Sequence, residues 1–355
     1  MLNRYPYTGT LPASFFDLVP PLYAELPFSW QEAAAAVQQL FAMEAVRHDI
    51  ILYTDHRQLR LVGIFPHGSK TAHFGFWETT DDVDLNRQAF ALLEADAAAS
   101  GCTSITGPLD FNTFQRYRLR LQDVPSWGTF DREPVNPAYY ANLLEQLAYE
   151  PTSTFESRRI RKEHIPAVYL DKQLYLDELQ KIPYDFIPIT PAVWQKYEPE
   201  IYALVHEVFG TNPSYKPVSR EQFRMLYNGT FAQKLCPYSS VLFREQASGR
   251  FAAMSFCHPN YYSLQLPATA SPIFAQDYPK LEKRVLLAKS VGVHPDFRGQ
   301  GLMNYLGAYG MLCFQEYYEE VIFCLMRSDN FSTHFTNMLP YESARYALFG
   351  KLLPA

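Results

Sequence analysis

The sequence predicts an α/β fold with mixed sheets, built as two successive domains. Three observations support this prediction. Short apolar runs of strand length alternate with longer runs whose apolar residues recur at helical spacing. The order of these elements in residues 1–165 recurs, with a different middle, in residues 166–355. A chain of 355 residues also has the length of two ordinary domains.

The first half is expected to contain five strands and three helices. Its first helix should open at Ser29, because Ser29 can cap the helix and Glu32 completes a capping box. A longer helix is stopped by Gly101, and Gly107–Pro108 ends the next strand. The expected strands are 51–53, 59–65, 72–77, 102–106 and 154–160, and the expected helices are 29–37, 85–100 and 137–149.

The second half is expected to follow a similar order. Ser219 is placed to cap a helix, and Ser248–Gly249 forms a turn between two antiparallel strands. The expected strands are 185–189, 240–244, 251–256, 285–293, 321–325 and 345–352, and the expected helices are 191–208, 219–228, 302–313 and 332–339.

Composition narrows the class of protein. Hydrophobic residues make up 48% of the chain, which is enough for a large core. The net charge of −6 argues against a nucleic-acid partner. The 5 cysteines are scattered without metal-ligand spacing, so we expect free thiols and no metal. With no signal-like leader and no apolar run long enough to span a bilayer, we expect a cytoplasmic protein without a membrane partner.

The stretch Val285–Asn330 organises the second half. An apolar strand reaches a turn, and a loop with Gly299 and Gly301 then opens a helix. The free N–H groups at a helix N-terminus bind anions, and glycines let the backbone approach a ligand closely. Gly292, within the strand, indicates a β-bulge or a close approach of another element. The stretch therefore predicts an anion cradle beside a strand edge.

Two motifs in this stretch resemble the signature of the GNAT acyltransferase superfamily. They are Val291-Gly292-Val293-His294-Pro295, which matches V-x-V-x-P, and Arg298-Gly299-Gln300-Gly301-Leu302-Met303, which matches Q/R-x-x-G-x-G/A except for Met303. The resemblance implies that the loop binds the pyrophosphate of an acyl-CoA and that pantetheine lies in a split between two strands. The donor-binding residues that it implies are Val291, Gly292, Val293, Arg298, Gly299, Gln300, Gly301, Leu302, Met303 and Asn330.

The first half is similar to the degenerate partner domain of a tandem-GNAT subgroup. Phe74–Trp77, Gly107–Thr113 and Pro137–Tyr140 carry this similarity. Glu78–Asp82 stands where the pyrophosphate loop would lie, and its carboxylates would repel phosphate. The expected architecture is two GNAT-like domains in tandem, each a mainly antiparallel sheet with a bulge-associated split and flanking helices. Residues 1–165 form the degenerate domain and residues 166–355 the acyl-CoA-binding domain.

The resemblance implies N-acylation of a small-molecule or amino-acid-like amine by direct attack on acyl-CoA, with acetyl-CoA as the first candidate donor. A backbone N–H near Val291 is the expected oxyanion donor. Three side chains are candidates for proton transfer: His258, Lys289 and Tyr341. Each has an alternative role: His258 could simply form a turn, Lys289 could bind a substrate carboxylate, and Tyr341 could serve in packing. Three alternatives stay open. An acyl-carrier protein could deliver the acyl group in natural-product biosynthesis, a biosynthetic tailoring enzyme could use the fold for different chemistry, or the chain could be a non-catalytic CoA sensor.

Overall fold

The computed structural model describes residues 2–28, 30–212, 215–267 and 270–354. The chain forms two compact units, which we describe separately. The first unit combines Met1–Phe155 with Ala344–Ala355, and the second is Glu156–Ser343. The sequence placed the boundary after residue 165 and assigned the chain's end to the second domain. The end joins the first unit instead, because its last strand pairs with strands of that unit.

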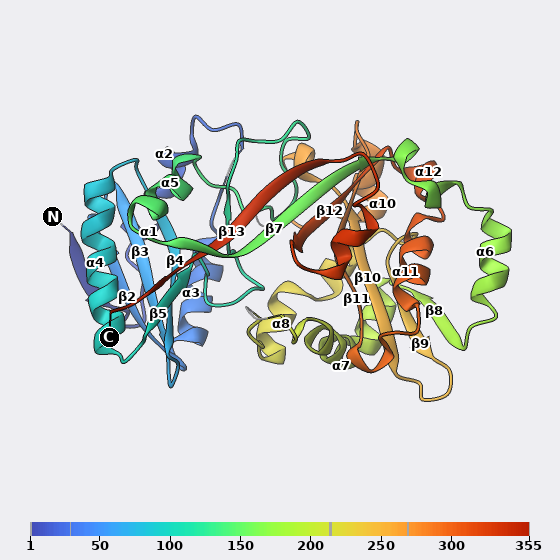
Figure 1. Ribbon diagram of the computed structural model, residues 1–355, viewed down its shortest axis with the longest axis horizontal. Helices are drawn as coiled ribbons and strands as arrows, with labels where there is room; N and C mark the ends of the chain where they lie inside the picture. Colours follow the sequence, from blue (N-terminus) through green and yellow to red (C-terminus); the bar gives the residue numbers. More distant parts are fainter. Residues whose placement is uncertain (1, 29, 213–214, 268–269, 355) are drawn as a thin grey trace. The chain divides into compact units, whose positions relative to one another are not determined.

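The sheet of the first unit has the strand order β1-β2-β3-β4-β5-β13, and β6 pairs with β13 (Figure 1). All of these neighbours are antiparallel except β4 and β5, which are parallel. The elements are β1 (Asn3–Pro6), α1 (Ser14–Asp17), α2 (Val19–Tyr23), α3 (Ala34–Glu44), β2 (His48–Thr54), β3 (Leu59–Pro66), β4 (Thr71–Thr79), α4 (Val83–Ala99), β5 (Ser104–Gly107), β6 (Leu119–Arg120), α5 (Tyr139–Gln146) and β13 (Glu342–Leu352).

Helices cover both faces of this sheet. Successive side chains of a strand point to opposite faces, so a strand that is apolar at successive positions needs cover on both faces. Leu61 of β3 packs in one cluster with Phe90 of α4. The next residue, Val62, packs in a separate cluster with Phe41 of α3. Burying each such side chain contributes about 1.5–3 kcal/mol. An apolar strand without polar alternation, as the sequence shows at β3, is thus explained by helices on both sides.

One predicted helix start in this unit is wrong. The helix expected at 29–37 begins at Ala34, with Ala33 as its N-cap, and Ser29 lies outside the described residues. Glu32 makes no capping box. Its carboxylate, which is almost fully buried, pairs instead with the buried Arg60 guanidinium at 2.5 Å. A buried ion pair of this kind decides where Glu32 lies, because either charge alone would be costly to bury.

The sheet of the second unit has the order β7-β12-β11-β10-β9-β8. Strands β11 and β12 are parallel, and β8 to β11 are antiparallel neighbours. The elements are β7 (Glu150–Arg161), which begins in the first unit, α6 (Lys172–Leu179), β8 (Tyr184–Pro188), α7 (Pro191–Phe209), α8 (Arg220–Leu226), α9 (Gly229–Gln233), β9 (Val241–Glu245), β10 (Phe251–Pro259), α10 (Phe274–Asp277), β11 (Val285–Val293), α11 (Leu302–Met311), α12 (Phe314–Tyr317) and β12 (Glu320–Arg327), with 3₁₀ helices at Lys162–His164, Pro166–Tyr169, Tyr262–Leu264, Tyr278–Lys280, Pro295–Phe297 and Phe331–Phe335.

Helices α7 and α11 cover opposite faces of this sheet. On one face, Trp194 of α7 packs on Phe256 of β10, with ring centroids 5.4 Å apart. On the other face, Leu302 and Leu306 of α11 pack in one cluster with Val293 of β11. The predicted mixed α/β architecture is confirmed.

Two sequence predictions about helices of this unit have different outcomes. Ser219 caps α8 as predicted, and Gln222 completes its capping box. The helix expected at 332–339 is only the short 3₁₀ helix Phe331–Phe335.

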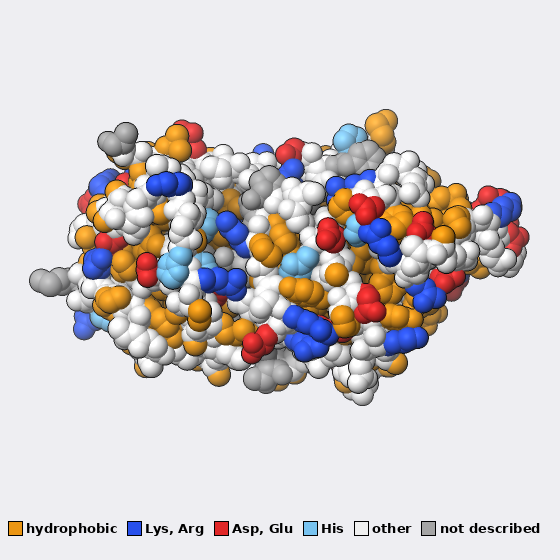
Figure 2. Space-filling model, turned by 90° about the horizontal axis from the view of Figure 1, so that it is seen from below, with side chains coloured by type: hydrophobic (Ala, Val, Ile, Leu, Met, Phe, Trp, Pro, Cys, Tyr) orange, Lys and Arg blue, Asp and Glu red, His pale blue; other side chains and the backbone are white. Residues whose placement is uncertain are grey.

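The surface carries charges of both signs. Figure 2 shows acidic and basic side chains interspersed with apolar ones over one face of the molecule. Among the described side chains of that face, the basic ones form no broad continuous field of the kind that a nucleic-acid backbone attracts. No helix within the described ranges combines the length and the hydropathy that a membrane span requires.

Candidate functional site

The candidate site lies where β11 and β12 separate. The two strands are paired over four positions, the last of which joins Ala288 to Phe323. Directly after this position, β11 carries an extra residue: Ser290 and Ala288 pair with successive residues of β10, which leaves Lys289 bulged. The sequence suggested Gly292 for a bulge. That position is wrong, because the register with β10 is regular there.

Gly292 instead permits the close approach of another element, which was the second possibility that the sequence indicated for this glycine. A β-carbon at position 292 would collide with the Val208 methyl group Cγ1 of α7. The helix therefore presses against β11 at the one residue without a side chain.

Strand β12 also contributes to the separation. Leu325 adopts a left-handed conformation, with φ of 57°, which is uncommon for a residue other than glycine. Its N–H donates to the Ser157 hydroxyl at 3.0 Å. Because Ser157 belongs to β7, the backbone of β12 turns toward β7 just after its pairing with β11 has ended. A bulge on one strand and a left-handed residue on the other thus keep the strands apart.

The separation leaves part of the β11 backbone on an open edge. The N–H of His294 donates to Ala252 of β10 at 2.8 Å. In an antiparallel pair, alternate residues direct their backbone groups to opposite sides. Val293 and Val291 therefore direct their N–H and C=O groups away from β10, toward the open edge. The Val293 carbonyl accepts a hydrogen bond from Arg298 Nε at 3.2 Å, so Val291 is the central group of this edge.

The loop that follows β11 fits an anion. Gly299 and Gly301 have φ of 83° and 75°, a left-handed conformation that favours glycine. Gly301 is the N-cap of α11, and it supplies no side-chain cap. Within the described part of the chain, none of the backbone N–H groups from Gly299 to Met303 donates to an acceptor of the protein. These donors and the helix dipole together suit a phosphate group.

Side chains hold this loop in place from elements that are distant in sequence. The Arg298 guanidinium bridges the Val293 carbonyl and the Val208 carbonyl, both at 3.2 Å. Gln300 accepts a hydrogen bond from the Tyr184 hydroxyl at 2.6 Å. Sequence reasoning missed Tyr184 and Val208, because no local pattern links either of them to the loop.

Met303 departs from the small residue that the motif usually has at this position. Its side chain is half-buried and packs against the apolar cluster that contains Val293 and Leu302. The larger residue is thus used in packing, and the loop keeps its two glycines.

The three predicted proton-transfer residues lie in different settings. His258 is 1% exposed, its Nδ1–H donates to the Pro259 carbonyl at 2.8 Å, and its ring stacks on Tyr261. His258 lies in β10, paired with Leu287 of β11, so this setting is that of a packed strand residue and not of the turn histidine that was the alternative. Lys289 is the bulged residue at the split and is half-buried. Tyr341 is 42% exposed and its ring lies under the Arg158 guanidinium, 4.3 Å away. Of the three, Lys289 borders the split.

Asn330 lies at the N-cap of the 3₁₀ helix that follows β12 and is exposed. Its N–H donates to the Arg327 carbonyl at 2.9 Å, and its own carbonyl accepts the Thr333 hydroxyl at 2.8 Å. The buried Arg158 guanidinium fixes the same segment by donating to the Thr333 carbonyl at 3.0 Å. The backbone around Asn330 is therefore well anchored while its side chain remains accessible.

The described residues contain no group of three or more His, Cys, Asp or Glu side chains arranged to hold a metal ion. Two buried thiols, Cys236 and Cys257, are unsuited to nucleophilic roles. Burial raises the pKa of the Cys257 thiol to about 12 and also raises the pKa of the buried Cys236 thiol.

Comparison with known proteins places this arrangement among solved folds. No family model matches the chain, and no curated protein matches its sequence. Among solved structures, it is similar to a tandem GNAT protein from the clavulanic acid biosynthesis pathway, with 13% identity, a TM-score of 0.53 and coverage of 100% of this chain and 99% of that one. It is also similar to a protein of unknown function from Enterococcus faecalis V583, described as a probable N-acyltransferase, with 9% identity, a TM-score of 0.54 and coverage of 99% and 73%. The chain therefore has the fold of the GNAT superfamily in its tandem form.

Proposed function

We propose that this protein is an N-acyltransferase that moves an acyl group, in the first place acetyl, from acyl-CoA to the amine of a small-molecule or amino-acid-like acceptor. One observation carries the proposal. The open edge of β11 at Val291 leads directly into a loop, Gly299–Met303, whose N–H groups have no acceptor in the described protein. An extended amide-bearing arm can pair with a strand edge, while a pyrophosphate binds the N–H groups of a helix N-terminus.

The proposed reaction is a direct transfer. The amine nitrogen attacks the thioester carbon, the C–N bond forms, and the C–S bond breaks. The Val291 N–H faces the open edge, so it is the proposed donor to the oxyanion of the tetrahedral intermediate. The acceptor must lose a proton, because an ammonium has no lone pair, and the leaving thiolate takes up a proton.

Lys289 is the side chain that we propose for a role at the acceptor. It borders the split, whereas the His258 ring is buried and the Tyr341 ring is stacked on Arg158. Lys289 either relays the proton of the amine or binds a carboxylate of the acceptor. Kinetics of Lys289→Met separate the two roles. A lower kcat with an altered pH profile indicates proton transfer, and a raised KM only for acceptors with a carboxylate indicates binding.

Donor binding and turnover are tested separately. Thermal shift of the full chain with CoA, acetyl-CoA and longer acyl-CoAs should show stabilisation, since a ligand that binds only the native state raises its stability. No stabilisation by any of these compounds contradicts the donor assignment. Release of free thiol from acetyl-CoA with a panel of amines then tests catalysis. Binding without turnover favours a CoA sensor, and turnover only with an acylated carrier protein favours a carrier-protein donor.

A further inference from the structure

The first unit contains a second split between parallel strands. Strands β4 and β5 pair over three positions, the last of which joins His73 to Thr106. Beyond it, β4 carries one extra residue relative to β3, because Val62 pairs with Gly75 and Arg60 with Glu78. Strand β4 then leads into α4, as β11 leads into α11. The two units therefore share one arrangement, and the groups that line the two splits can be compared.

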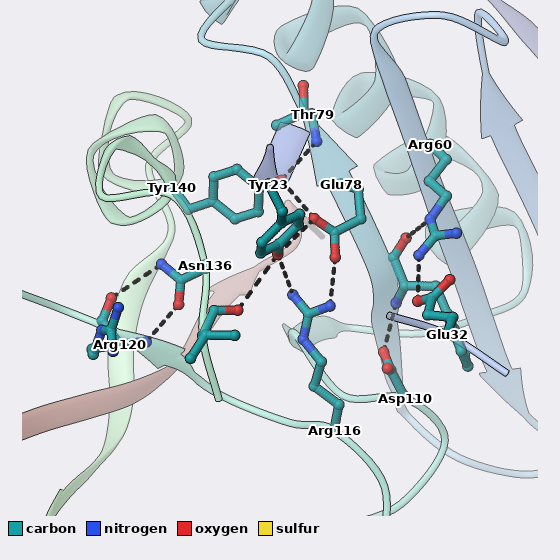
Figure 3. Close-up of polar contacts among 12 residues, drawn as sticks. Tyr23, Glu32, Arg60, Glu78, Thr79, Asp110, Arg116, Arg120, Asn136 and Tyr140 are labelled. Atoms are coloured by element: carbon teal, nitrogen blue, oxygen red, sulfur yellow. Dashed lines mark hydrogen bonds and ion pairs between the residues drawn. The ribbon is translucent and has the colours of Figure 1, made fainter. Parts of the chain in front are cut away.

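The open edge of β4 is occupied by the protein's own chain. The Phe74 carbonyl accepts a hydrogen bond from the Leu109 N–H at 2.8 Å. The Phe76 N–H donates to Asp110 Oδ1 at 2.6 Å, and the Phe76 carbonyl accepts from Arg60 Nε at 3.0 Å. Figure 3 shows Asp110 and Arg60 converging on this strand. In the second unit, the corresponding edge at Val291 has no such contact from another segment among the described residues.

The fit of this segment leaves no room for another chain. A β-carbon at Gly75 would lie 2.5 Å from the Leu109 carbonyl oxygen and 2.9 Å from Asp110 Oδ1. Leu109 is 2% and Asp110 6% exposed. A further hydrogen bond holds the segment in place: the Asp110 N–H donates to the Arg116 carbonyl at 2.9 Å. Leu109 and Asp110 therefore pack against β4 as tightly as core residues do, and no empty groove remains between them.

The helix N-terminus of this unit is also occupied. The Asp82 carboxylate caps α4 by accepting from the N–H groups of Asp84 and Leu85, at 3.0 and 2.9 Å. An aspartate at this position satisfies the donors that an external anion would use. Helix α11 has no side-chain cap. Both anchoring points that are open in the second unit are thus taken by carboxylates in the first.

We infer that the first unit's split is closed by the chain's own segment Pro108–Asp110, which takes the strand edge that an extended amide-bearing donor would need, so that each chain binds one donor. The stoichiometry rests on the proposed function. The closure itself does not, because it concerns contacts within the free protein.

The closure is tested without ligand by hydrogen exchange at the Phe76 amide in the full chain. In Asp110→Ala, this amide should exchange about tenfold faster or more, because its acceptor is lost. In Asp110→Asn, whose side-chain oxygen can accept the same hydrogen bond, protection should be kept. Asp123→Asn, an exposed position in the same unit, is the control. Equal protection of Phe76 in the wild type and in Asp110→Ala would overturn the closure.

The stoichiometry is tested on the wild-type chain, so a folding defect in a variant does not affect it. Calorimetric titration with acetyl-CoA should give one site per chain. Exchange protection should increase at 291–303 and stay unchanged at 74–76 and 83–86. Two sites per chain, or new protection at 74–76, would overturn the inference. If no binding occurs at either unit, the proposed function fails, and the ligand-free measurement still decides the closure.

Discussion

Gly292 of β11 lies against Val208 of α7 so closely that a β-carbon on Gly292 would collide with the Val208 methyl group. This contact sets the position of α7 against the strand whose edge forms the candidate site. Because Gly292 and Val208 are both buried, the distance between them cannot increase unless α7 moves.

We expect Gly292→Ala to destabilise the second unit by about 1–3 kcal/mol, the usual cost of an overpacked core. Urea unfolding, followed by hydrogen exchange of α7 and β11, measures the loss. The double variant Gly292→Ala with Val208→Ala should recover part of the stability, because the colliding methyl group is gone. No recovery would mean that the cost arises from the backbone at 292 and not from Val208.

Val291→Pro should lower kcat by about 100-fold or more, because proline removes the proposed oxyanion donor. We expect the strand to tolerate this change at position 291 in particular. The N–H there faces the open edge and is not part of the ladder with β10, and the preceding residue, Ser290, lies within the same strand. Val291→Ala, which keeps the N–H, should stay within a few-fold of wild type. Steady-state thiol release compares the two, and equal activities would place the oxyanion donor elsewhere.

Gly301→Asp should abolish detectable donor binding, while Gly301→Asn should retain most of it. Position 301 is left-handed with φ of 75°, which Asn and Asp both tolerate better than other side chains. The space beside it is open, since a β-carbon would meet nothing within 4 Å. The two variants therefore differ mainly in a negative charge at the loop, which repels pyrophosphate. Calorimetry with acetyl-CoA is the measurement, and similar affinities would place the anion site away from this loop.

The first unit should lose stability as pH rises from about 4 to about 7. Burial raises the pKa of the Asp110 carboxyl to about 7, although Arg116 and the hydrogen bond from Phe76 oppose this shift. Because the folded-state pKa lies above the unfolded value of 3.8, the folded state holds the proton more tightly between these limits. Its contribution is full below about pH 4 and is lost above about pH 7, amounting to about 4 kcal/mol at most.

Asp110→Asn should flatten this dependence, because an amide does not titrate in this range. Tryptophan fluorescence in a Trp194→Phe background reports the first unit, in which the other tryptophans of the chain lie. Asp123→Asn is the matched control and should keep the slope. The same slope in Asp110→Asn as in the control would assign the effect to another group.

Local patterns predicted the elements well where local physics decides them. The span 285–293 is a strand as predicted, and Ser219 caps its helix, because apolar periodicity and capping depend on neighbouring residues. The Ser29–Glu32 prediction failed because Glu32 pairs with Arg60, which is distant in sequence. A tertiary ion pair of this kind leaves no local pattern.

The candidate site shows the same limit. The motif indicated Gly299 and Gly301, whose left-handed conformation follows from the lack of a side chain. It did not indicate that Lys289 is the bulged residue, because bulge position depends on register with β10. Nor did it indicate that Asp110 closes the first unit's split, because that contact joins a loop to a strand edge 34 positions earlier.

The last strand bears on how the protein is made. Residues 344–352 of β13 complete the sheet of the first unit by pairing with β5 and β6, although the whole second unit is synthesised in between. On the ribosome, the unit that emerges first therefore lacks this strand until residues 344–352 have been synthesised, and the β13-facing edge of β5 is unpaired until then. A C-terminal truncation before residue 344 should thus damage the N-terminal unit and leave the second unit nearer to intact, the reverse of what linear order suggests.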